Sequence, residues 1–193
     1  MNRPASVHSK LQRALALATA LCLSTPAGAQ HAHGQHQHGH QPQAGHQHGA
    51  AYAGMQNRPI KALSEQQVAD LRAGKGMSLA LPAELNGFPG PMHTLELAGP
   101  LQLNVDQQAR TRALFEQMQR EASAAGETLI VAEAELDALF RDRRVTPALL
   151  TAAVAKAAQA QGTLRETHLR YHLRMMEVLS TEQVAAYNRM RGY

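Results

Sequence analysis

Residues 104–147 read NVDQQARTRALFEQMQREASAAGETLIVAEAELDALFRDRRVTP, and they predict one long helix that ends in a turn. Apolar or small residues recur in steps of three and four, which places them on one helix face. This first seam consists of Leu114, Met118, Ala122, Ala125, Leu129, Ala132, Leu136 and Leu139. Asn104 is the expected N-cap, with Gln107 as its capping-box partner, and the helix is expected to end near Asp142. Gly126 is a poor helix former, so we expect it to mark a bend.

A second long helix is expected after the turn. Thr146 has the side chain of an N-cap, and Pro147 suits the first helical position. The second seam consists of Leu150, Val154, Ala157, Gln161, Leu164, His168, Tyr171, Met175 and Leu179. Its steps match those of the first seam. The two helices are therefore predicted to pack as an antiparallel hairpin about 50 Å long, at about 1.5 Å per residue.

Short helices are expected on both sides of the hairpin. Ser64 begins a capping box at the start of the first of them. Three prolines and two glycines within residues 79–91 predict an irregular loop, and a second short helix is expected over residues 92–98. Ser180 begins another capping box, and the last helix is expected to end near Arg191.

The fold class that follows is all-α: a long antiparallel helical hairpin with short flanking helices. The sequence has no Trp, three Phe and four Tyr, which suits narrow helical seams better than a broad core. A hairpin of only two helices leaves part of its apolar seam uncovered. We expect a homodimer to cover it, and a monomer completed by the two short N-terminal helices is the alternative.

Residues 1–29 have the three parts of a signal peptide for export. Arg3, Lys10 and Arg13 precede a short apolar run, and an A-x-A site predicts cleavage after Ala29. The run is shorter than the roughly 20 residues that span a bilayer, so we expect no stable membrane insertion. Cleavage removes three basic residues and no acidic ones, which lowers the formal charge from +4 to +1. It also removes Cys22, the single cysteine, so the mature chain has no thiolate ligand.

Residues 30–57 are predicted to form a disordered, histidine-rich tail. Apart from its histidines, the stretch QHAHGQHQHGHQPQAGHQHG, residues 30–49, has no acidic, basic or aromatic residue, and it has no hydrophobic periodicity. Its candidate metal ligands are His31, His33, His36, His38, His40, His46 and His48. Imidazole binds Zn, Cu, Ni and Co, and binding should weaken as the pH falls through about 6.5. The alternative is a solvated linker whose histidines bind nothing.

A second set of candidate ligands lies in the helical region. His168 and His172 are four residues apart, so both project from one helix face, and Met176 extends the row by one turn. His93 and Glu96 form an i, i+3 pair on the preceding short helix and could complete the site. If the hairpin pairs around residue 144 or 145, Glu121 and Gln117 should lie near the two histidines. The alternative is that His168, which falls on the apolar seam, is a core residue.

Three short segments carry a resemblance to a known family. LSEQQ (63–67), LNVDQ (103–107) and LSTEQ (179–183) resemble the LTxxQ boxes of Spy/CpxP-type periplasmic chaperones and the related heavy-metal-resistance and metal-sensor proteins. The resemblance covers roughly residues 60–193, and the helical domain is expected over residues 58–193. Ser, Asn and Ser replace the expected Thr, but each still caps a helix. The resemblance implies a cradle-shaped antiparallel dimer, ATP-independent holding of unfolded proteins and, in some members, a metal site of His, Glu and Met.

The basic residues allow two interpretations. Arg165, Arg170 and Arg174 form a row on the second long helix, and Arg141, Arg143 and Arg144 lie at the hairpin turn. In chaperone relatives, a basic and apolar concave face receives unfolded proteins. The alternative is a solvated helix face on which Glu166 and Glu177 are local partners.

These features favour a periplasmic stress or metal-resistance protein that binds transition metals and holds unfolded envelope proteins without ATP. The alternative is a metal sensor or an accessory regulator that contacts a sensor kinase or an anti-sigma factor. A structural dimer with an inert tail is the third possibility. The sequence contains no nucleophile–base pair, no Gly-rich phosphate loop and no basic-aromatic pattern. We therefore expect neither an enzyme nor a nucleic-acid-binding protein, and no obligatory cofactor.

Overall fold

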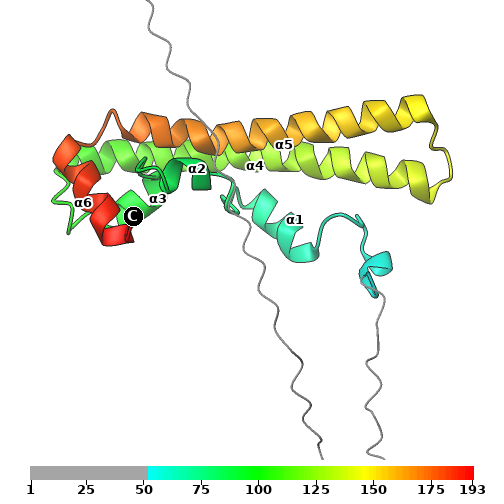
Figure 1. Ribbon diagram of the computed structural model, residues 1–193, viewed down its shortest axis with the longest axis horizontal. Helices are drawn as coiled ribbons and strands as arrows, with labels where there is room; N and C mark the ends of the chain where they lie inside the picture. The colour runs from blue at the N-terminus through cyan, green and yellow to red at the C-terminus, as the bar shows by residue number, and fades with distance from the viewer. Residues whose placement is uncertain (1–51) are drawn as a thin grey trace, which may run out of the picture. The chain divides into compact units, whose positions relative to one another are not determined.

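The computed structural model describes residues 52–193, and this part of the chain is helical without strands (Figure 1). The helices are the 3-10 helix η1 (Met55–Asn57) and the α-helices α1 (Glu65–Arg72), α2 (Leu81–Glu84), α3 (Pro91–Glu96), α4 (Val105–Arg141), α5 (Pro147–Met175) and α6 (Thr181–Arg191). The predicted all-α class is confirmed. The predicted signal peptide and the seven tail histidines lie outside the described residues. Within residues 52–193, no helix is long and apolar enough to cross a membrane.

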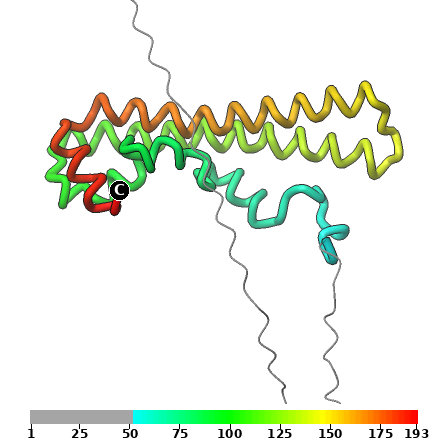
Figure 2. The backbone as a smooth tube through the Cα atoms, viewed as in Figure 1, coloured from blue at the N-terminus to red at the C-terminus, as the bar shows by residue number. Residues whose placement is uncertain are grey.

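Helices α4 and α5 run side by side as the predicted antiparallel hairpin (Figure 2). α4 has 37 residues and α5 has 29, which correspond to lengths of about 55 Å and 43 Å. The turn between them forms as the sequence predicts: Pro147 is the first residue of α5, and the Thr146 hydroxyl accepts a hydrogen bond from the backbone N–H of Leu149. The local chemistry of this turn therefore fixes where one helix ends and the next begins.

The seams are mostly as predicted, with one error in phase on α5. Buried seam residues include Leu114, Met118, Ala122, Leu129 and Ala132 on α4, and Ala157, Leu164, His168, Tyr171 and Met175 on α5. Gln161 is exposed, and Ala160 is buried in its place; Val154 is also exposed. Both Gln161 and Ala160 fit the spacing of the seam, because they are neighbours in the sequence. The helix buries Ala160, the apolar one of the two. Leu179 is buried, but it follows α5 and lies in the turn before α6.

The three capping boxes form, and two of them bind each other. The side chains of Ser64, Asn104 and Ser180 each accept a hydrogen bond from the backbone three residues later. The Nε2 group of Gln107 also donates to Gln183 Oε1 at 2.8 Å, and Gln183 Nε2 donates to the carbonyl of Leu101 at 3.2 Å. The glutamines of the second and third boxes therefore connect the start of α4 to the start of α6.

The segment predicted as an irregular loop contains a helix. Residues 81–84 form α2, with Pro82 in the first turn, where its missing N–H breaks no hydrogen bond. The backbone before α2 is irregular, because Met77 and Ser78 have φ angles of 44° and 65° in the left-handed region. The proline and glycine content therefore predicted the irregular backbone correctly, but it did not reveal the single helical turn of α2.

Gly126 is the position at which α1 rests on α4. A Cβ atom there would lie 2.5 Å from the carbonyl oxygen of Leu71 and 3.0 Å from its carbon. A Cβ at Gly74, where φ is +65°, would likewise collide with the backbone oxygen of Gln119. α4 continues without interruption through Gly126, and the bend predicted there stays a prediction. The missing side chain serves the close approach of a second helix backbone.

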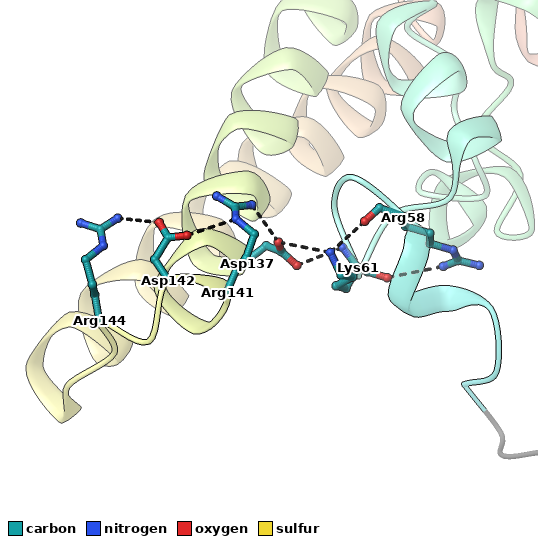
Figure 3. Close-up of polar contacts among 6 residues, drawn as sticks. All are labelled: Arg58, Lys61, Asp137, Arg141, Asp142 and Arg144. Atoms are coloured by element: carbon teal, nitrogen blue, oxygen red, sulfur yellow. Dashed lines mark hydrogen bonds and ion pairs between the residues drawn. The ribbon is translucent and has the colours of Figure 1, made fainter.

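The N-terminal part of the described chain contacts the C-terminal end of α4 (Figure 3). The backbone N–H of Lys61 donates to Asp137 Oδ1 at 3.2 Å, and Lys61 Nζ lies 3.7 Å from Asp137 Oδ2. Arg141 binds the same carboxylate at 3.4 Å. Helix η1 precedes this anchor and falls within the last six residues of the segment assigned to the tail.

The short helices cover one side of the hairpin only in part. Helices α1 and α3 both pack against α4, as the monomeric alternative requires. Large apolar side chains nevertheless stay exposed on the half of the hairpin nearest its turn: Val131, Phe140, Val145, Leu149 and Val154. The predicted homodimer stays a prediction.

The two glycines inside the long helices provide a matched test of the α1 contact. A Cβ at Gly162 in α5 would meet open space, whereas a Cβ at Gly126 would meet the Leu71 carbonyl. Gly162→Ala should raise the free energy of unfolding by about 0.5–1 kcal/mol through helix propensity. Gly126→Ala should lower it by about 1–3 kcal/mol, because the added methyl group displaces α1. Urea unfolding of both variants measures this, and equal gains would contradict the contact.

Candidate functional site: a pocket lined by histidine and methionine

A pocket of about 530 Å³ lies between the hairpin and the segment that connects α1 to α3. The side chains that matter for its chemistry are His93, His168, His172, Met77, Met92, Met118 and Glu84. Gly74, Gly76 and Gly90 bring the connecting backbone close to its wall. We call it the histidine pocket.

His168 is buried without a polar partner for one of its ring nitrogens. The residue is 2% exposed, and its Nε2 atom has no hydrogen-bond partner among the described residues. Burial lowers the pKa of His168, and the neighbouring His172 lowers it further. The imidazole is therefore neutral at ordinary pH, with a ring nitrogen that no group within residues 52–193 satisfies.

His172 is held in one orientation by the backbone. Its Nδ1 atom lies 2.7 Å from the carbonyl oxygen of Phe88. Because a carbonyl only accepts, Nδ1 carries the proton and a neutral ring keeps its lone pair on Nε2. A Cβ at Gly90 would lie 2.8 Å from Cε1 and 3.1 Å from Nε2 of this ring, so glycine is what allows the connecting segment to lie there.

His93 is oriented in the same way by a carboxylate. Its Nδ1 atom lies 2.9 Å from Glu96 Oε2, so Nδ1–H donates and Nε2 is again the nitrogen with the lone pair. Histidines that bind metals commonly donate their other ring N–H to a carboxylate or a backbone carbonyl. His93 and His172 both show this arrangement. The side chain of His93 is also partly exposed, which gives solutes access to the pocket.

Glu84 is a buried carboxylate whose charge is already matched. The Tyr187 hydroxyl donates to Glu84 Oε1, and Arg191 Nε lies 3.4 Å from the same oxygen. His172 Nδ1 lies 3.7 Å from the other oxygen. Burial and the hydrogen bond to Glu84 raise the pKa of Tyr187. These contacts attach α6 to the wall of the histidine pocket.

The structure brings together three of the residues predicted from sequence and separates the others. His93, His168 and His172 line one pocket, and Glu96 orients His93. Met176 does not line the pocket and is 39% exposed. Sequence reasoning missed Met77, Glu84, Met92 and Met118. Glu84 stood out in the sequence only as an acidic residue within an apolar, proline-rich segment.

The prediction that Gln117 and Glu121 lie near the histidines is wrong. Arg170 binds Glu121 Oε2 at 2.7 Å, and Arg174 binds Gln117 Oε1 at 3.1 Å. At about 100° per residue, positions 170 and 174 lie on the side of α5 opposite to positions 168 and 172. Glu121 and Gln117 face that arginine side.

The arginine row itself is occupied by local contacts. Arg170 also forms an ion pair with Glu166 at 2.9 Å, and the guanidinium groups of Arg170 and Arg174 lie over the ring of Tyr171. These contacts favour the interpretation of a solvated, locally paired helix face. Such exposed pairs add little to stability.

The arrangement fits an ion that accepts nitrogen and sulfur together. Within residues 52–193, no three His, Asp or Glu side chains stand close enough to hold one ion. The pocket does combine imidazole nitrogens with thioether sulfurs, which are ligands of soft and borderline metals. The donor set and the unsatisfied nitrogen of His168 are thus compatible with a transition metal.

The all-α hairpin carries three boxes of the LTxxQ kind, each at the start of a helix. A family model described as heavy-metal resistance matches residues 78–186. The match spans more than half of the chain, so the protein belongs to the heavy-metal resistance family, which is related to Spy/CpxP. The resemblance seen in the sequence is confirmed. No curated protein and no solved structure matches the chain.

Acid should destabilise the metal-free protein through His168. The lowered pKa means that the folded state keeps this ring neutral while the unfolded chain binds a proton below about pH 6.5. The stabilising contribution is present above that pH and is lost as the pH falls toward the folded-state pKa. We expect a loss of about 1 kcal/mol per pH unit relative to His168→Leu. Urea unfolding between pH 8 and pH 5 with a chelator measures it, and parallel curves would contradict it.

Proposed function

We propose that the protein is exported to the periplasm and binds transition-metal ions, with an ordered site in the histidine pocket. One observation carries this proposal. Residues 52–193 contain three histidines, and all three line the same pocket although they come from α3 and α5. Two of them have their Nδ1 atoms engaged by acceptors, as metal ligands commonly do. Binding is the function proposed; no catalysis is needed.

The tail is the second binding element of the proposal. Its seven histidines include four His-x-His spacings, at 31/33, 36/38, 38/40 and 46/48, which supply ligands close together in the sequence. Such a segment binds several ions loosely, whereas an ordered pocket binds one. We propose that the tail buffers Zn, Cu, Ni or Co while the pocket gives selectivity. The alternative function is a metal sensor that reports to a sensor kinase. The pocket supports this alternative too, because a sensor needs one selective site.

Metal titration by calorimetry tests the proposal. The chain from Gln30 onward and a variant with all seven tail histidines changed to Gln are each titrated with Zn and with Cu. The tail variant should keep one ion per chain. Adding His168→Leu and His172→Leu to it should lower the affinity at least about tenfold, which is the loss expected when two ligands are removed.

Circular dichroism provides the control that each variant is folded. Loss of all binding with the tail substitutions alone would overturn the pocket as a site. One tight ion per chain favours sensing, and several loose ions favour buffering.

We further propose that the hairpin holds unfolded envelope proteins without ATP. The support is the group of exposed apolar side chains near the hairpin turn, among them Phe140 and Leu149. Large apolar side chains that are exposed in the same part of a surface favour protein contact. Arg143 and Arg144 lie in the same turn and add positive charge. A second copy of the chain is the other possible occupant of this surface.

Polar substitution on that surface separates the two occupants. Phe140→Ser combined with Leu149→Ser should weaken the suppression of aggregation of reduced α-lactalbumin at least about twofold, because apolar contact area is lost. Leu173→Ser is the control, since Leu173 is 59% exposed but lies far along α5 from the turn. An equal effect of the control would contradict the assignment. A change from dimer to monomer in light scattering would assign the surface to self-association instead.

A further inference from the structure

We infer that the histidine pocket is selective for a soft monovalent ion, Cu(I) or its analogue Ag(I), bound by imidazole and thioether ligands together. This inference rests on the proposed metal-binding function and names the class of ion. It depends on three methionines that the sequence did not indicate as ligands: Met77, Met92 and Met118, which line the same pocket as the three histidines. Thioether sulfur is a soft ligand that favours Cu(I) over harder divalent ions.

The methionines come from three parts of the chain. Met118 belongs to α4 and is buried at the wall shared with His168. Met92 lies next to His93 in α3 and is exposed. Met77 lies in the segment after α1, where its own φ angle and that of Ser78 are in the left-handed region. Left-handed backbone at residues other than glycine is uncommon and often accompanies a functional constraint. Here it occurs where a thioether is brought to the pocket.

The number of available nitrogen and oxygen ligands makes the pocket a weaker site for a divalent ion such as Zn than for a soft monovalent ion. Zn, Ni and Co need three or four nitrogen or oxygen ligands when thiolates are absent. Within residues 52–193, no three His, Asp or Glu side chains lie close enough for this. Cu(I) and Ag(I) accept two or three ligands, so one or two imidazoles with one or two thioethers are sufficient.

The charge around the pocket leads to the same class of ion. Glu84 is the one carboxylate among the lining residues, and Tyr187 and Arg191 already engage it. Lys75, also on the wall, is paired with Asp70 at 2.8 Å. An ion bound by neutral histidine and methionine therefore keeps its full charge. Because the cost of moving an ion out of water grows with the square of its charge, a monovalent ion is much less penalised than a divalent one.

The direct test is the response of the methionine methyl groups to metal. The chain from Gln30 onward, with the seven tail histidines changed to Gln, is labelled with ¹³C at the methionine methyl carbons. Silver nitrate is then added under anaerobic conditions. The resonances of Met77, Met92 or Met118 should shift and saturate at one ion per chain. Those of Met176 and Met190, which do not line the pocket, should not move.

Affinities measured by competition with a chromophoric Cu(I) chelator provide the second readout. Met118→Leu and Met77→Leu keep the volume and apolar character of the side chain, so the fold is expected to survive. Each should weaken Cu(I) binding at least about tenfold and leave Zn binding unchanged, because only a soft ion uses the sulfur. Met176→Leu is the matched control, since Met176 follows His172 by four residues, just after the end of α5, but does not line the pocket.

The outcomes separate this inference from the proposed function. If His168→Leu abolishes Zn binding and neither Met→Leu change affects Cu(I), the pocket is a metal site but not a soft one. If no ion binds once the tail is silenced, both the inference and the proposed function fail. If Met176→Leu weakens Cu(I) binding as much as Met77→Leu, the thioether ligands lie outside the pocket and the inference is overturned.

Discussion

The close approach of the α1 backbone to α4 is the constraint on which the rest of the structure depends. Gly126 leaves room for the carbonyl of Leu71, and Gly74 leaves room for the backbone of Gln119. These two contacts fix the point at which the chain leaves α1 and crosses α4. The segment that follows carries Met77, Glu84 and Gly90, which together form one wall of the histidine pocket. The pocket therefore exists because two glycines allow a short helix to lie against a long one.

Helix α5 presents a different chemistry on each of its two sides. Arg170 and Arg174 face Glu121 and Gln117 across the hairpin, and their guanidinium groups lie over Tyr171. His168 and His172 face the connecting segment instead. His168 also marks the border between two apolar clusters, one containing Leu164 and the other containing Met118 and Tyr171. The pocket thus interrupts the core of the hairpin at the position where an apolar residue would otherwise continue the seam.

The sequence predicted those features of the fold that local interactions determine. The caps at Ser64, Asn104, Thr146 and Ser180 follow from side chains that bond to backbone three residues away, and the hairpin follows from the spacing of its seams. His168 and His172 were recognisable as a pair because residues four apart on one helix lie on the same face. Features that depend on distant contacts were missed or misplaced.

Gly126 illustrates why distant contacts escape sequence reasoning. From the sequence alone, a glycine that bends a helix looks the same as a glycine that allows another backbone to approach closely. The position of the Leu71 carbonyl shows that Gly126 has the second role. Gln117 and Glu121 were placed on the wrong side because a small error in phase across the hairpin rotates a residue from one face to another. Met77 and Glu84 belong to a segment whose path is set by glycine contacts and left-handed backbone, and neither has a periodic pattern.

The unsatisfied nitrogen of His168 connects stability to binding. A buried polar atom without a partner costs about 1–3 kcal/mol, so a core position occupied by this histidine is less stable than an apolar one would be. An ion bound only by the folded state stabilises that state by about 2.7 kcal/mol when its concentration is 100 times its dissociation constant. The two free energies are similar, so a bound metal ion can compensate for the stability that is lost by burying His168. The wall of the histidine pocket includes the segment between α1 and α3, and Glu84 in that segment contacts α6. Stabilisation by the metal would therefore act on the half of the hairpin that lies farther from its turn. It would leave the exposed apolar surface near the turn unchanged, and the two proposed binding functions would then operate independently on one hairpin.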